Sequence, residues 1–140
     1  MILSPQDMLC FSLYSTAHAM QAAYKPLLEP LGITYPQFLV LSTLWTRDGL
    51  TVGAIGEEMM LESSTLTPLL KKLESKGLVS RIRDKQDERK VRIWLTEDGQ
   101  DMRSKTEGFA ECILESSCLS ADEAIKLRDD VLALRDKLTR

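Results

Sequence analysis

The chain has 140 residues, enough for one domain with a sizeable core, and its 44% hydrophobic and 28% charged residues are typical of a globular protein. The net charge of −3 and the isoelectric point near 5.2 would by themselves argue against a nucleic-acid partner. No secretion signal or membrane-spanning run is recognisable, so we expect a cytoplasmic protein that does not enter a membrane. Its three cysteines would be reduced there, and an odd number excludes a disulfide framework.

The first predicted helix begins directly after Ser4, which can cap it, with Pro5 at its first position. Residues 8–24 are apolar in nearly every direction around this helix, and Pro26 and Pro30 are expected to end it. A helix of this kind must be buried on several sides. A domain of this length has little left to cover it, so we predict that a second copy of the chain does so in a homodimer.

Two shorter helices follow. Thr34 and Gln37 form a capping-box pattern that predicts a helix running to about Trp45. Thr51 can cap a short helix that runs to about Met59.

The next helix carries the most informative pattern of the chain. We predict a turn over Leu61–Ser64 and then a helix with Leu66, Leu69, Leu70 and Leu73 in one apolar stripe. We expect Pro68 on its other face to cost little, because it falls near the first turn. That face is small, hydroxylic and basic, which suits phosphates and base edges. It carries Ser64, Thr67, Pro68, Lys71, Lys72 and Ser75.

A hairpin is predicted next, because the alternating runs Leu78–Arg83 and Lys90–Leu95 flank a polar loop over residues 84–89. In the first run, Leu78 and Ile82 are expected to point to one side and Val79, Arg81 and Arg83 to the other. Helix, turn, helix and basic hairpin in this order predict a winged helix-turn-helix. The alternative is a small α+β core whose hairpin only covers a helix.

Charge is distributed unevenly along the chain. Residues 71–92 contain nine basic and four acidic residues, a net charge of +5, whereas the rest contains nine basic and seventeen acidic residues, a net charge of −8. A basic segment on an acidic body is typical of a local DNA-binding site. We therefore predict double-stranded DNA as a partner in spite of the overall negative charge.

The last part of the chain is predicted to be helical. Thr96 can cap a long helix, and Ser120 with Glu123 forms a second capping box that opens a final helix.

The predicted fold is mainly α (α+β), a single domain over residues 1–140. Residues 50–95 form its winged helix-turn-helix, and residues 1–46 and 97–140 form a helical dimerisation region.

One thiol lies among aromatic residues on the first helix. Cys10 and Tyr14 are neighbours at i and i+4. Tyr24 lies on the same side but roughly 21 Å further along the helix axis, at about 1.5 Å per residue. It could therefore reach a Cys10 only in the second copy of an antiparallel dimer, where its hydroxyl would favour the reactive thiolate. The alternative is an inert buried cysteine among packing tyrosines.

No metal or cofactor is expected. His18 is the only histidine, and the cysteines have no spacing that suits zinc. The sequence also lacks a glycine-rich phosphate loop and a CxxC pair.

Two stretches resemble the recognition helix and wing of the MarR family of bacterial repressors, SSTLTPLLKKLESKGLVSR (63–81) and DERKVRIWLTEDG (87–99). Two more, LCFSLYS (9–15) and YKPLLEPLGITYPQFLVL (24–41), resemble the organic-hydroperoxide-sensing repressors of the OhrR type. The similarity extends over nearly the whole chain.

The resemblance implies roles for single residues. Cys10 would be the peroxide-reactive cysteine, and Tyr24 and Tyr35 would hold its thiolate from the other subunit, with Tyr14 beside it. The serines and threonines at the start of the recognition helix would enter the major groove, and Arg89 the minor groove. The residues predicted to contact DNA are Ser63, Ser64, Thr65, Thr67, Lys71, Lys72, Arg83 and Arg89.

One part of the family pattern differs in this chain. Two-cysteine relatives carry a resolving cysteine late in the long helix, and Glu115 occupies that position here. Cys112 and Cys118 flank it, and Cys118 is favoured because it is nearer the loop. A single-cysteine mechanism, in which a small thiol caps Cys10, stays open.

These features predict a repressor that binds a pseudo-palindromic operator as a homodimer and releases it when an organic hydroperoxide oxidises Cys10. Two alternatives remain. One is a MarR-type repressor that responds to a phenolic or drug-like ligand. The other is a thiol peroxidase, for which the sequence offers no site for a reductant.

Overall fold

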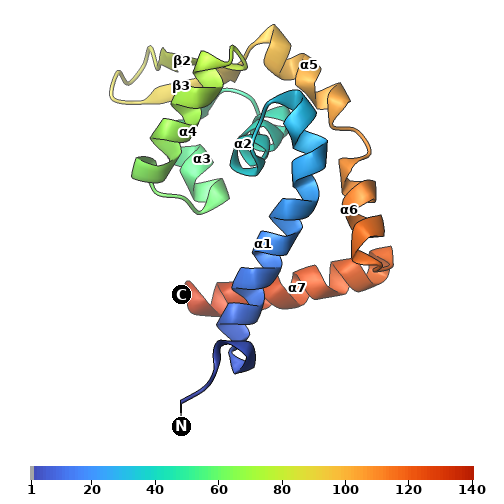
Figure 1. The fold of residues 1–140 in the computed structure, drawn as a ribbon. Helices are drawn as coiled ribbons and strands as arrows, with labels where there is room; N and C mark the ends of the chain where they lie inside the picture. Colours follow the sequence, from blue (N-terminus) through green and yellow to red (C-terminus); the bar gives the residue numbers. More distant parts are fainter. Residues whose placement is uncertain (1) are drawn as a thin grey trace. The chain divides into compact units, whose positions relative to one another are not determined.

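The computed structural model describes residues 2–140, which form helices and one small antiparallel sheet (Figure 1). None of the helices in this part of the chain is long and apolar enough to cross a bilayer. In chain order the elements are η1 (Pro5–Asp7), α1 (Leu9–Leu28), η2 (Glu29–Leu31), α2 (Tyr35–Thr46), β1 (Leu50–Thr51), α3 (Val52–Met59), α4 (Ser63–Ser75), β2 (Val79–Arg83), β3 (Val91–Leu95), α5 (Glu97–Lys105), α6 (Phe109–Ser117) and α7 (Ala121–Leu138).

The chain divides into two compact units. The winged-helix unit is Tyr24–Glu107, and the terminal unit consists of Met1–Ala23 and Gly108–Arg140. The winged-helix unit contains the whole stretch 50–95 that was predicted to form a winged helix-turn-helix. The segments predicted to dimerise are divided between the units, and their role remains a prediction.

The helix-turn-helix consists of α3 and α4. Thr51 caps α3 as predicted, because its hydroxyl accepts a hydrogen bond from the amide of Ala54 at 3.1 Å. The turn is shorter than predicted. α4 already begins at Ser63, with Glu62 as its N-cap residue, so that both serines lie in the first helical turn.

The leucine stripe of α4 faces the core, as the sequence predicted. Leu66, Leu70 and Leu73 are almost fully buried, and Leu69 is half-buried. Each fully buried leucine contributes about 1.5–3 kcal/mol of hydrophobic free energy, which anchors the helix by one face. The other large apolar side chains buried to the same degree are Val40, Leu41, Leu44, Ile55, Val79 and Ile93.

Pro68 lies deeper in α4 than we predicted. Because the helix starts at Ser63, Pro68 is beyond its first turn, and its missing N–H leaves the Ser64 carbonyl without the usual i+4 donor. The expectation that this proline costs little was therefore wrong. Pro68 is exposed, so the Ser64 carbonyl can bond to water.

The predicted hairpin is β2 and β3, which pair antiparallel with Val79 opposite Leu95. A third strand, β1, was not predicted. Leu50 pairs with Ile93, which gives the strand order β1-β3-β2. A strand of two residues has no detectable periodicity. This one forms because its backbone pairs with that of β3.

The predicted grouping of Leu78 with Ile82 on one side of the strand was wrong. Ile82 is 51% exposed, whereas Val79 is 2% exposed and faces the core. Leu78 is buried, but it precedes the strand and follows the left-handed turn at Gly77. The alternation therefore starts at Val79, and Ile82, paired with Arg92, points to the outer face.

The first helix starts and ends later than predicted. Ser4 does not cap it. Its hydroxyl donates to Asp7 at 2.8 Å within a 3-10 turn, and α1 begins at Leu9. Pro26 does not end the helix, which continues to Leu28.

Both predicted capping boxes are confirmed. In α2 and α7, the side chain of the N-cap residue accepts from the third helical amide, and the side chain of that third residue accepts from the N-cap amide. These residues are Thr34 with Gln37, and Ser120 with Glu123.

The prediction of a single long helix after Thr96 was wrong. The structure has two helices there, α5 and α6. The hydroxyl of Thr106 donates to the Arg103 carbonyl at 2.8 Å and so competes with the helical backbone pattern. Gly108 then adopts a left-handed conformation with φ of +83°. The boundary between the two units lies at this break.

The terminal unit leaves large apolar side chains exposed. Leu9, Phe11, Tyr14 and Met20 of α1 are 39–64% exposed, and none of the residues of α7 is buried. On α7 the exposed apolar side chains are Ile125, Leu127, Val131 and Leu138. Exposed apolar side chains in this number on two helices favour an interaction surface in this unit.

Close packing at the base of the hairpin generates the first prediction. A Cβ at Gly99 would lie 2.0 Å from the backbone oxygen of Leu78, so Gly99→Ala should lower the free energy of unfolding by about 1–3 kcal/mol, as overpacking does. Gly53→Ala is the matched control. A Cβ there has no neighbour within 4 Å, and stability should stay the same or rise by up to about 1 kcal/mol. Urea unfolding measures both, and equal stability of the two variants would contradict the close approach.

Candidate nucleic-acid interface and thiol site

The exposed start of α4 offers hydrogen-bond donors to a ligand. Ser63, Ser64 and Thr65 are all exposed in its first turn. Glu62 precedes them but makes no side-chain capping bond within the described residues. The first amides of the helix and the three hydroxyls can therefore donate outward, which suits phosphate and base edges.

Further along α4 the outward face becomes basic. Lys71 and Lys72 are exposed, and Thr67 is half-buried beside them. Because the buried leucine stripe holds the opposite face, these groups cannot rotate inward. The helix thus presents hydroxyls near its start and ammonium groups further along.

The tip of the hairpin holds a braced arginine. The Arg89 side chain is 92% exposed, and its Nε donates to Asp87 Oδ1 at 3.2 Å. The same carboxylate oxygen accepts the Arg89 amide at 3.1 Å. Asp87 thus braces both the side chain and the backbone of Arg89. Arg83 lies exposed at the end of β2 and donates to the Glu88 carbonyl at 2.9 Å.

A second ion pair, which sequence reasoning missed, fixes the base of the wing. Arg92 donates through Nε to Asp84 Oδ2 at 3.1 Å and through a terminal nitrogen to the Gly49 carbonyl at 2.8 Å. A backbone hydrogen bond from Gln86 and the Arg92 guanidinium hold the pKa of Asp84 below its ordinary value. The carboxylate is therefore charged at neutral pH. The bonds of Arg92 to Asp84 and Gly49 join β3 to the end of β2 and to the turn before β1.

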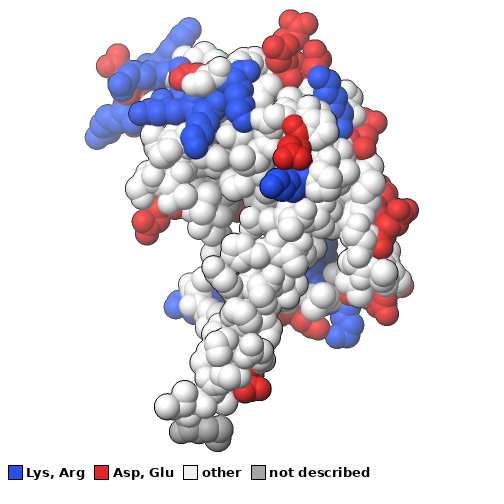
Figure 2. All heavy atoms as spheres, viewed as in Figure 1, with Lys and Arg blue, Asp and Glu red and all other residues white. Residues whose placement is uncertain are grey.

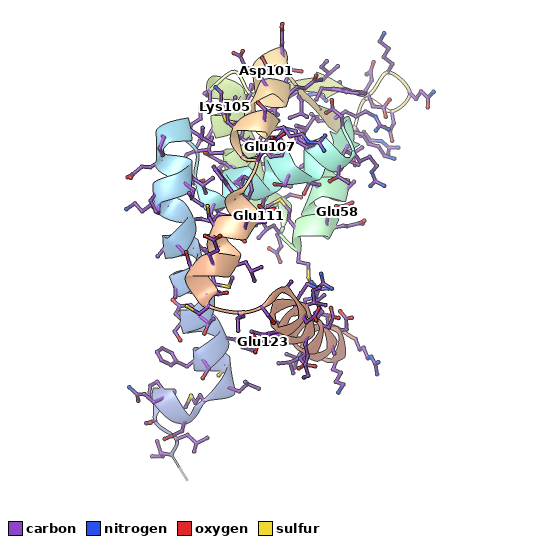
Figure 3. The ribbon with its side chains drawn as sticks, turned by 90° about the vertical axis from the view of Figure 1, so that its right-hand side faces the viewer. Glu58, Asp101, Lys105, Glu107, Glu111 and Glu123 are labelled. Carbon is purple, nitrogen blue, oxygen red and sulfur yellow. The ribbon has the colours of Figure 1, made fainter. Side chains whose placement is uncertain are left out.

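Lysine and arginine side chains gather over the hairpin (Figure 2). Acidic side chains lie on other elements, among them Glu58 on α3, Asp101 on α5 and Glu111 on α6 (Figure 3). Outside residues 71–92 the net charge is −8. Within the winged-helix unit, basic side chains are therefore grouped over the hairpin, as the sequence predicted.

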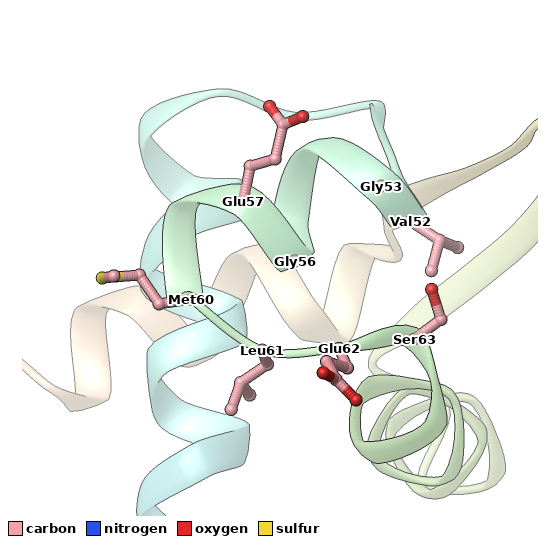
Figure 4. Close-up of a pocket in the computed structure, with 8 residues that line it drawn as sticks. All are labelled: Val52, Gly53, Gly56, Glu57, Met60, Leu61, Glu62 and Ser63. Carbon is pink, nitrogen blue, oxygen red and sulfur yellow. The ribbon is translucent and has the colours of Figure 1, made fainter. Parts of the chain in front are cut away.

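An open groove of about 600 Å³ lies between α3 and the start of α4 (Figure 4). Its walls include Val52, Met60 and Leu61, together with the carboxylates of Glu57 and Glu62. Apolar and acidic walls do not suit a phosphate. The groove is therefore less suited to an anion than the basic and hydroxylic face.

Two of the predicted thiolate-stabilising tyrosines lie together in the winged-helix unit. The ring centroids of Tyr24 and Tyr35 are 4.9 Å apart, and Phe38 lies 5.7 Å from Tyr24. Burial raises the pKa of both hydroxyls, and the charge of an ionised Tyr35 raises the pKa of Tyr24 further. Both hydroxyls are thus protonated at neutral pH. Neither has a hydrogen-bond partner among residues 2–140, so both can donate to an acceptor from outside.

The cysteines all lie in the terminal unit as free, exposed thiols. Cys10 is in the first turns of α1, and Tyr14 one turn later contacts the ring of His18 edge-on at 4.5 Å. Cys112 lies within α6. Cys118 ends that helix in a left-handed conformation with φ of +56°, which is uncommon for a residue with a Cβ. None of the described residues forms a cluster that could hold a metal ion.

The family profile described as "Transcriptional regulator SarA/Rot" matches residues 22–106. The chain is also 43% identical over 133 residues to the organic hydroperoxide resistance transcriptional regulator of Bacillus subtilis. This match covers 95% of this chain and 90% of that protein. The chain belongs to the MarR/SarA winged-helix transcriptional regulators.

Solved structures of related regulators agree with this assignment. Reduced AbfR bound to DNA is 39% identical to this MarR/SarA regulator and gives a TM-score of 0.78, with 94% of this chain and 92% of that chain covered. The disulfide form of AbfR, also 39% identical, gives a TM-score of 0.62, with 94% and 87% covered. The winged-helix fold predicted from the sequence is therefore confirmed.

The exposed wing generates the second prediction. Arg89→Ala should weaken binding to a duplex selected in vitro with the reduced regulator by about tenfold and lower the slope of log K against log salt by about 1, because one cationic contact is lost. Arg128→Ala on α7 is the control, because the Arg128 side chain is also exposed, at 62%, and is also paired with an aspartate, Asp129. It should change neither quantity. Fluorescence anisotropy over a salt series measures both quantities. An unchanged slope in Arg89→Ala would contradict contact between the wing and DNA.

Proposed function

We propose that this regulator is a homodimeric repressor that binds a pseudo-palindromic operator and releases it when an organic hydroperoxide oxidises Cys10. The observation that carries the proposal is the combination of an exposed free thiol on α1 with two protonated tyrosine hydroxyls that lack an acceptor. The names of the related proteins support it, since one is a regulator of organic hydroperoxide resistance and another has been solved in reduced and disulfide forms.

The DNA-binding half of the proposal rests on the basic face of the winged-helix unit. The first turn of α4, with Ser63, Ser64, Thr65 and Thr67, would enter the major groove, and Arg89 would enter the adjacent minor groove. Contacts to phosphates would come from Lys71, Lys72 and Arg83. Two copies related by a two-fold axis would then read two half-sites about one helical turn apart.

The dimer is supported by the exposed apolar side chains of α1 and α7. Large side chains such as Phe11 and Leu127 are 39% and 53% exposed in the single chain. A second copy would remove these faces from water, which stabilises association by about 25 cal/mol for each Å² of apolar surface buried. In such a dimer, Tyr24 and Tyr35 of one subunit would donate to the Cys10 thiolate of the other, with Tyr14 beside that thiolate on its own helix.

The chemistry at Cys10 is proposed as a single oxidation. The thiolate attacks an oxygen of the hydroperoxide, a sulfur–oxygen bond forms, the oxygen–oxygen bond breaks, and the alkoxide takes a proton to leave as an alcohol. A sulfenic acid at Cys10 no longer accepts the tyrosine hydroxyls as a thiolate does. The contacts between the subunits would therefore change at the position where the two tyrosines meet.

The sulfenic acid would then be resolved by a second thiol. The thiolate of Cys118 or Cys112 attacks the Cys10 sulfur, a disulfide forms, and hydroxide leaves and is protonated to water. Cys118 is favoured because it ends α6 in a left-handed conformation next to the loop. A small thiol could instead cap Cys10. By either mechanism, the protein would react once with its signal and would not turn over as an enzyme. We propose that it acts as a cytoplasmic regulator.

The third prediction concerns the sensing residue. One equivalent of cumene hydroperoxide should release the wild-type regulator from its selected duplex, whereas Cys10→Ser should stay bound, because it has no thiolate to oxidise. Anisotropy before and after the peroxide measures release, and dithiothreitol should restore binding if the product is a disulfide or sulfenic acid. Release of DNA from Cys10→Ser by the same dose would overturn the assignment.

The fourth prediction distinguishes the resolving thiols. After the same treatment, non-reducing electrophoresis should show a crosslinked dimer for wild type and for Cys112→Ser, and only monomer for Cys118→Ser. Loss of the crosslink in Cys112→Ser alone would assign the role to Cys112. DNA release by wild type without any crosslink would favour capping by a small thiol.

A further inference from the structure

We propose that Lys76 and Gln37 position Tyr35 and connect the tyrosine pair to the recognition helix, so that the state of Cys10 is transmitted to α4 within one subunit. This inference rests on the proposed function, because it assigns a route to the same redox response. All the residues that carry it lie in the winged-helix unit.

The connection centres on one amide oxygen. Oε1 of Gln37 accepts the Thr34 amide at 3.0 Å and the Lys76 ammonium at 2.9 Å. Gln37 is only 2% exposed and lies as a polar residue within the core of the described chain. Because both donors share this one oxygen, a movement of the Gln37 side chain changes both bonds at once.

One end of the connection is the start of α2, where Tyr35 is the first helical residue. Tyr35 directly follows Thr34, whose hydroxyl accepts the Gln37 amide at 3.4 Å. The capping box therefore fixes the backbone that carries the Tyr35 ring. A displacement of Tyr35 towards or away from a partner's thiolate must be accommodated by Thr34 and Gln37.

The other end is the C-terminus of α4. Lys76 is the C-cap residue of this helix, and its backbone N–H bonds to the carbonyls of Lys72 and Glu74. Its ammonium donates to Gln37 and also to the carbonyl of Gly32, in the turn that joins η2 to α2. The side chain of one residue thus joins the end of the recognition helix to the segment between the two tyrosines.

The charges around Lys76 make this link sensitive to movement. A cation is favourable at the C-terminus of α4 but unfavourable at the N-terminus of α2. The ammonium is held there by the carbonyl oxygens of Gly32 and Gln37. If the α2 terminus moves when the tyrosines lose their thiolate acceptor, these bonds weaken, and the cap of α4 changes with them.

The test compares operator affinity before and after oxidation. Lys76→Met keeps the aliphatic stem but removes the ammonium. We expect its reduced form to bind the selected duplex within about threefold of wild type. The ratio of reduced to oxidised affinity should fall by about fivefold or more. A change of this size is within the range by which residues between two coupled sites alter their coupling. The rate at which cumene hydroperoxide consumes the Cys10 thiol should match wild type, because the sensing end is untouched.

Lys105→Met is the matched control, an exposed lysine on α5 outside the connection (Figure 3). It should oxidise, bind and release as wild type does. If Lys76 only contacted a phosphate, Lys76→Met would weaken both redox forms equally, lower the salt slope by about 1 and leave the affinity ratio unchanged, which would overturn the proposal.

A double-mutant cycle with Gln37→Met gives a second, independent readout. If the two residues act through one bond, Lys76→Met should change the affinity ratio in wild type but add nothing in the Gln37→Met background. Additive effects of the two substitutions would overturn the proposal. If the wild-type complex survives oxidation, the proposed function fails and the coupling fails with it. If wild type releases and Lys76→Met releases as completely, only the coupling is overturned.

Discussion

Burial of the leucine stripe on α4 is the constraint on which the DNA-binding surface depends. Leu66, Leu70 and Leu73 are at most 1% exposed, and they fix the rotation of the helix about its own axis. With that rotation fixed, the serines and threonines of the first turn and the lysines of later turns have only one direction to face. Pro68, which breaks the backbone ladder, is tolerated because the apolar contacts on the opposite face hold the helix.

The wing depends on contacts to segments far away in the chain. Asp48 accepts the Leu95 amide at 2.9 Å, Trp45 donates to the Gly99 carbonyl at 2.9 Å, and Arg92 joins the hairpin to Gly49 and Asp84. These polar bonds lie where α2 ends and β1 begins. The exposed tip with Arg89 is therefore carried on a braced base, which gives an arginine on a long loop a defined direction.

The proposed sensor, by contrast, is incomplete in a single chain. Its thiols lie in the terminal unit, and its tyrosine pair lies in the winged-helix unit. The tyrosine hydroxyls are protonated and lack an acceptor, and the apolar faces of α1 and α7 lack cover. A second copy of the chain would supply an acceptor for the hydroxyls and would cover the apolar faces. Dimerisation, sensing and DNA release are therefore proposed as one linked property. The pairing of Lys76 with Gln37 then offers a route inside each subunit from the tyrosines to the recognition helix.

The sequence by itself determined the features that depend on local periodicity and capping. These are the winged helix-turn-helix, the capping boxes at Thr34 and Ser120, the leucine stripe and the basic segment. Each depends on residues that lie only a few positions apart in the sequence. Tertiary structure alone decided the outward direction of Ile82, the added strand β1 and the break at Gly108. It also decided the 4.9 Å approach of Tyr24 to Tyr35 and the bond between Lys76 and Gln37. The roles of the cysteines and of the DNA-contacting side chains remain predictions. Contacts between positions distant in sequence leave no periodic signal, since either partner alone is compatible with many surroundings, and only the folded chain brings them together.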